Sequence, residues 1–185
     1  MLAGMMTILM MMQTQAPTPP PAVTEGRPVN SVQQAKVMPR TGDAVVLGTI
    51  NAADANMIEA STLATTKGSN GAVKGYAATV LKDHQKSLTD GANLAKALNV
   101  VRVLPSDSMM ARAQKAAMDK LNLLTGVAFD QAYLRYTIDA HDALLKKDVA
   151  ALPAKAQRSE VRIFLADRQK MLRAHEEAGE KLLKK

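Results

Sequence analysis

Apolar residues recur at every third or fourth position along most of the chain after residue 50. In one run, Val73, Ala77, Val80, Leu81 and Leu88 fall on a single face if the segment is an α-helix. The composition agrees, because the chain has 12 Met but no Trp, two Phe and three Tyr, and this balance favours helices over sheets. The sequence therefore predicts an all-α domain.

Helix-breaking residues divide this pattern into four long segments. The predicted helices cover residues 51–67, 71–98, 108–150 and 156–183. Four amphipathic helices with short connections favour an antiparallel four-helix bundle, which we assign to residues 48–185.

Local signals refine two of these helices. Asn51 is the predicted N-cap of the first helix, and Asp54 follows three residues later in a position typical of a capping box. Gly126 lies within the third helix and indicates a bend or a close helix contact there.

The N-terminal part has a different composition. Residues 1–16 are apolar and rich in Met, and they resemble the core of a secretory signal that is too short to span a membrane. Residues 17–47 contain most of the prolines and little periodicity, so we expect a disordered linker. The expected location is the periplasm or the cell envelope.

The formal charge of +7 raises the question of a polyanionic partner. Basic residues are interspersed with acidic ones along the helices, and the basic runs, such as Lys146-Lys147, are short. This pattern is typical of solvated helix faces, so no nucleic acid is expected as a partner. Association with anionic envelope polymers or a membrane surface stays open as an alternative.

The three histidines are the candidate functional residues. His84, His141 and His175 each lie on the apolar face of a different predicted helix, where a buried imidazole needs a partner. They are expected either to brace the helices through hydrogen bonds or to bind Zn, Cu or Fe, with Glu59 as the candidate carboxylate ligand.

A di-iron centre is not expected. Such bundles place a Glu three residues before each metal-binding His, whereas Leu81, Ile138 and Leu172 occupy these positions here. The chain also has no cysteine, no glycine-rich phosphate loop and no Gly-x-Ser-x-Gly motif, and these absences favour a non-enzymatic protein.

Several stretches resemble the bacterial family called domain of unknown function 4142. They are residues 59–64, 73–84, 121–126 and 129–133, together with His141. The resemblance implies a ferritin-like four-helix bundle, an export signal and no established activity. It places the family's motif positions at Glu59, Asp83, His84, Phe129, Asp130, Tyr133, His141 and His175. The segment 169–175 keeps Leu172 and His175 but lacks the proline that is usual in this family.

Two functional hypotheses follow. The first is an exported, non-enzymatic helical bundle with a role in stress tolerance, in which the histidines are structural. The alternative is a periplasmic metal-binding or redox protein that uses the core histidines.

Overall fold

The computed structural model describes residues 42–103, 109–148 and 151–185, and these residues form helices with no strand among them. The helices are α1 (Gly42–Lys67), α2 (Gly71–Ala97), α3 (Met109–Leu123), α4 (Gly126–Ala143), the π-helical turn η1 (Leu144–Asp148), α5 (Leu152–Lys155) and α6 (Ser159–Leu183). The predicted all-α class is confirmed. The signal-like segment 1–16 and residues 17–41 of the predicted linker lie outside the described residues. Within the described ranges, no helix combines the length and the hydropathy needed to cross a membrane.

Helix α1 begins at Gly42, so the predictions of a linker up to residue 47 and of an N-cap at Asn51 are wrong. The apolar side chains of its first turns are buried in a cluster that includes residues of α5 and α6. The carboxylate of Asp43 also accepts a hydrogen bond from the backbone nitrogen of Gln157, at 2.7 Å. These tertiary contacts stabilise helical turns that precede the local capping signal.

Helix α2 begins where the sequence predicts. Asn70 is its N-cap, and the side-chain oxygen of Asn70 accepts a hydrogen bond from the backbone nitrogen of Ala72, at 2.8 Å. The helix ends at Ala97, one residue before the predicted end.

The segment predicted as one helix over residues 108–150 is broken. Helix α3 ends at Leu123, and α4 begins at Gly126, whose φ angle is +58°. Glycine adopts this left-handed conformation without strain, so the chain reverses direction here instead of bending.

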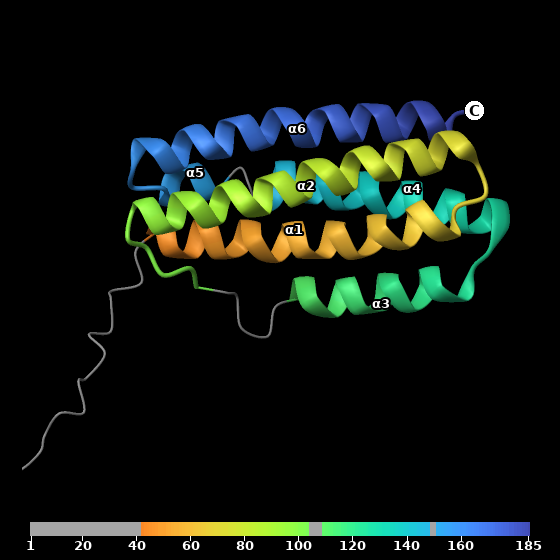
Figure 1. The fold of residues 1–185 in the computed structure, drawn as a ribbon, viewed down its shortest axis with the longest axis horizontal. Coiled ribbons are helices and arrows are strands. Elements are labelled where there is room, and N and C mark those ends of the chain that lie inside the picture. Colours follow the sequence, from red (N-terminus) through yellow and green to blue (C-terminus); the bar gives the residue numbers. More distant parts are fainter. Residues whose placement is uncertain (1–41, 104–108, 149–150) are drawn as a thin grey trace, which may run out of the picture. The chain divides into compact units, whose positions relative to one another are not determined.

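Four long helices, α1, α2, α4 and α6, lie side by side (Figure 1). Helices α1 and α6 each pack on both α2 and α4, and the sequence colouring shows that every such pair is antiparallel. Helices α2 and α4 run in the same direction, because α3 carries the chain back along the outside between them (Figure 1).

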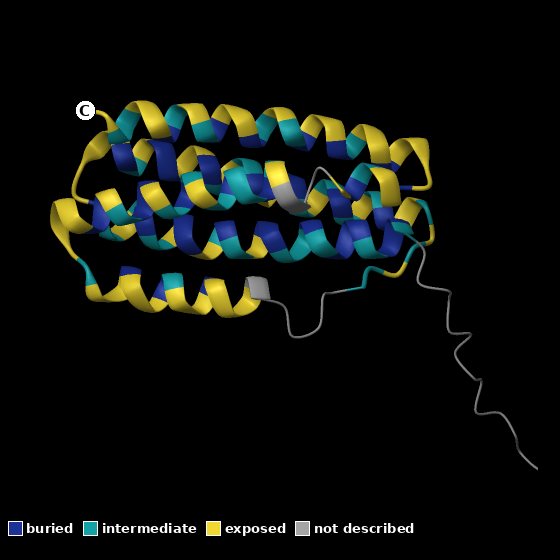
Figure 2. Cartoon of the chain, turned by 180° about the vertical axis from the view of Figure 1, so that it is seen from behind, coloured by how far each residue is buried: buried dark blue, intermediate teal, exposed yellow. Residues whose placement is uncertain are grey.

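The inner faces of these helices form two apolar clusters, and the outer faces are exposed (Figure 2). One cluster contains Leu47 of α1 and Leu165 of α6, and the other contains Phe129 and Tyr133 of α4. Along α1, α2 and α4, the buried positions between the two clusters include polar residues. The functional candidates lie in this polar layer.

Candidate metal centre

Each of the four long helices contributes at least one buried side chain to the polar layer. Asp54 comes from α1, His84 from α2, His141 from α4 and His175 from α6. The first three are fully buried, and His175 is 4 % exposed. The histidine positions follow the apolar spacing of their helices, so the packing that forms the core also places the imidazoles inside it.

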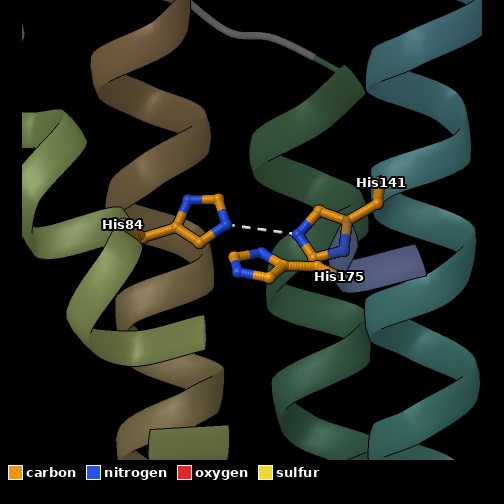
Figure 3. Close-up of side chains that lie close together, drawn as sticks. All are labelled: His84, His141 and His175. Carbon is orange, nitrogen blue, oxygen red and sulfur yellow. Dashed lines mark hydrogen bonds between the residues drawn. The ribbon is translucent and has the colours of Figure 1, made fainter. Parts of the chain in front are cut away.

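The three imidazoles point toward one another (Figure 3). One ligand nitrogen from each lies within 4.8 Å of the others. The ring centroids are 5.4 Å apart for His84 and His141, 5.6 Å for His84 and His175, and 5.2 Å for His141 and His175. The structure therefore brings together all three histidines that the sequence singles out.

The bond to Asp54 fixes the protonation pattern of two rings. Nδ1 of His84 lies 2.8 Å from Oδ1 of Asp54, and because a carboxylate only accepts, this Nδ1 carries the proton. Nε2 of His84 then carries a lone pair, which accepts a hydrogen bond from Nε2 of His141 at 3.2 Å. As a result, Nδ1 of His141 is a buried lone pair with no partner among the described residues.

The third ring has a carboxylate partner of its own. Nε2 of His175 donates a hydrogen bond to Oδ2 of Asp83 at 2.9 Å, so Nδ1 of His175 carries a lone pair. This Nδ1 is buried and has no partner in the described part of the chain. Metal-binding histidines commonly donate their outer N–H to a carboxylate in this way, which orients the inner nitrogen. The pairs Asp54–His84 and Asp83–His175 both have this arrangement.

Arg168 of α6 holds Asp54 in place. Its Nη1 donates to Oδ1 of Asp54 and, at 2.8 Å, to Oγ of Ser87. Arg168 is only 3 % exposed, and its charge compensates the buried carboxylate. Asp54 is thereby oriented toward His84.

Burial lowers the pKa of all three histidines. For His84 and His175, burial outweighs the opposite effect of the carboxylate bonded to each ring. The pKa of His141 is well below its ordinary value because of burial and then because of the two neighbouring imidazoles. The rings are therefore neutral at neutral pH, which is the state that binds metals.

The nitrogen positions suit one transition-metal ion. Tetrahedral zinc with Zn–N bonds of about 2.0 to 2.1 Å has ligand nitrogens roughly 3.4 Å apart. The 3.2 Å between His84 and His141 already matches, and closing the cluster from its 4.8 Å limit requires side-chain shifts of about 1 Å. On binding, His141 must present a lone pair in place of the N–H that now points to His84.

The structure does not bring Glu59 to this cluster. Its side chain is exposed on α1 and accepts a hydrogen bond from Nε2 of Gln114 at 2.9 Å. The acidic residue of α1 that faces the histidines is Asp54, which the sequence assigns to a capping box.

The other motif residues have structural contacts. The carboxylate of Asp130 accepts three hydrogen bonds, from the backbone nitrogens of Ser69 and Asn70 and from Oγ of Ser69, and so closes the turn between α1 and α2. Phe129 stacks on Tyr133 with ring centroids 6.5 Å apart. The hydroxyl of Tyr133 is bonded to that of Ser61 at 2.9 Å.

Apolar spacing alone does not identify two residues of the polar layer, although the sequence contains a signal for each. Arg168 lies three residues after Leu165 and four before Leu172, so a charged residue occupies a core position. Asp54 follows Ala53 and precedes Met57 in the buried face of α1. A charge of each sign on two apolar faces indicates a buried ion pair.

Comparison with known proteins gives a family but no described activity. No curated protein and no solved structure matches this chain. A family model described as a domain of unknown function, DUF4142, matches residues 28–182 of the 185-residue chain, and the protein therefore belongs to this family.

Proposed function

We propose that this protein is an exported, ferritin-like four-helix bundle that binds one transition-metal ion through His84, His141 and His175. The observation that carries the proposal is that one ligand nitrogen from each of three buried imidazoles lies within 4.8 Å of the others, and that Nδ1 of His175 is a buried lone pair with no partner among the described residues. Buried polar atoms are nearly always paired, and a metal ion is the partner that suits several converging imidazole nitrogens.

Two features support the ferritin-like comparison. Ferritin-like bundles have one long crossover, and here α3 lies in the connection that leaves α2 and α4 parallel (Figure 1). Such bundles also hold metals between their inner faces. The ligand set differs, however, because this cluster has three histidines and no bridging carboxylate.

The chemistry of the donor set favours zinc or copper over iron. Three neutral imidazoles suit Zn and Cu, whereas Fe sites in bundles of this kind use several carboxylates. Binding is a better fit than catalysis, because the cluster is closed to solvent on its His84 and His141 sides. Asp54 and Asp83 each bond to a ligand imidazole and orient it, and Asp83 also offsets part of the charge of a bound cation.

A structural role is the second candidate. The bond between Asp54 and His84 links α1 to α2, and the bond between Asp83 and His175 links α2 to α6. The two candidates differ in what they require of the unpartnered Nδ1 of His175. A structural role leaves this lone pair without a partner, whereas metal binding uses it.

Denaturant unfolding with and without zinc chloride separates the two candidates. A ligand that binds only the folded state at 100 times its Kd adds about 2.7 kcal/mol to the free energy of unfolding. We expect such a gain for the wild-type chain and none for the triple variant His84→Ala, His141→Ala, His175→Ala. The control Ser61→Ala removes a buried polar group outside the cluster and should keep the gain. No gain in the wild-type chain would leave only the structural role.

A further inference from the structure

The three histidines are not equally accessible from the surface. A cavity of about 460 Å³ lies between α2 and α6, and His175 is among its lining residues, whereas His84 and His141 are not. His175 thus belongs both to the wall of this cavity and to the histidine cluster. The cavity reaches the buried site at this one ring.

Asp83 extends the connection to solvent. It also lines the cavity, its side chain is 37 % exposed, and its Oδ2 accepts the hydrogen bond from Nε2 of His175. Asp83 is the acidic residue of the lining, and carboxylate oxygens are ligands that a hydrated dication accepts readily. The exposed Lys181 at the same cavity keeps its ammonium group in water.

Small residues form part of the cavity wall, and a hydrogen bond connects the two helices that carry them. Gly75, Ala174 and Ala178 leave the space open, and the hydroxyl of Tyr76 donates to the backbone oxygen of His175 at 3.0 Å, which ties α6 to α2. The opening beside His175 is therefore part of the packed fold and does not require the helices to separate.

We propose that this cavity is the route by which a divalent metal ion reaches the buried cluster. Asp83 is the first ligand along the route, His175 is the second, and His84 and His141 complete the site. This inference rests on the proposed metal centre and adds its access path. The order follows the burial of the four side chains, from the partly exposed Asp83 to the fully buried His84 and His141.

The fold offers a variant that blocks the route without disturbing the core. A Cβ atom built on Gly75 meets no atom within 4 Å, so a phenylalanine side chain attached there has room to extend over the cavity. Gly71 is the matched control. It lies in the same helix, its Cβ also meets nothing within 4 Å, and it does not line the cavity. Gly75→Ala separates the loss of glycine from the filling of the cavity.

The test is the rate of cobalt(II) uptake by the full-length chain, followed by stopped-flow visible absorption after mixing with cobalt chloride. We expect Gly75→Phe to slow association about tenfold, which corresponds to about 1.4 kcal/mol in activation free energy. Dissociation into excess chelator should slow by the same factor, since a blocked path acts in both directions and leaves Kd unchanged. Gly75→Ala and Gly71→Phe should both bind at the wild-type rate.

The outcomes separate the access route from the site itself. Wild-type uptake rates in Gly75→Phe, with its fold confirmed by circular dichroism, would show that ions enter elsewhere and overturn the route alone. Equal slowing in Gly71→Phe would also overturn it. If the wild-type chain gave no cobalt spectrum at equilibrium, the metal centre itself would be wrong, and the route with it.

Discussion

Acidification should destabilise the metal-free protein through its buried histidines. Because burial lowers their pKa values in the folded state, the unfolded state binds more protons below the ordinary histidine pKa of about 6.5. The free energy of unfolding therefore rises with pH in this window, and stability is lost as the pH falls below about 6.5.

The magnitude follows from the number of rings that stay neutral when folded. One histidine that takes up no proton in the native state lowers the free energy of unfolding by about 1.2 kcal/mol between pH 7 and pH 5.5. The pKa of His141 is lowered most clearly, and this histidine alone gives a lower limit of about 1 kcal/mol for the loss in the free energy of unfolding. All three histidines together give an upper limit of about 4 kcal/mol.

Urea unfolding in the presence of a chelator, at several pH values between about 7 and 5.5, measures this change in the free energy of unfolding. This pH range lies above the range in which carboxylates titrate. The variant His141→Leu is the control. It should reduce the pH-dependent loss by about 1.2 kcal/mol, whatever its absolute stability. A wild-type free energy of unfolding that stays constant within about 0.5 kcal/mol over this range would refute the neutral, buried state of the cluster.

Two substitutions test the contacts of the motif residues. Asp130→Ala should lower the free energy of unfolding by about 2 to 4 kcal/mol, because the hydrogen bonds from Ser69 and Asn70 lose a charged acceptor. A loss below about 1 kcal/mol in urea unfolding would contradict this role for the carboxylate. Tyr133→Phe should cost about 1 to 2 kcal/mol by leaving the buried hydroxyl of Ser61 without its partner, and adding Ser61→Ala should restore part of the loss. A double variant less stable than Tyr133→Phe alone would contradict the pairing.

The sequence predicts much of this fold because apolar spacing determines which faces are buried. The stripe of α2 predicts the inward direction of His84 correctly, and Asn70 marks the start of that helix. The start of α1 could not be predicted in the same way. Its first turns are stabilised by contacts with residues more than 100 positions away, such as the bond between Asp43 and Gln157.

The site was predictable in part for the same reason. Helical spacing shows that three histidines point inward, but it does not show that they meet, because this depends on how the helices are aligned along their lengths. Asp83 illustrates the limit. It is adjacent to His84 in sequence, yet its carboxylate binds His175 on another helix. Neighbouring positions on a helix point in different directions, so a sequence pair does not indicate a contact.

The central claim is that the three histidines hold one metal ion, and metal content tests it most directly. The untagged full-length chain and its triple histidine variant would be supplied in turn with zinc, copper, iron and manganese, desalted and measured by mass spectrometry. We expect about one zinc or copper ion per wild-type chain and almost none in the variant. Less than about a tenth of an ion per wild-type chain with every metal, or equal binding by the variant, would contradict the claim.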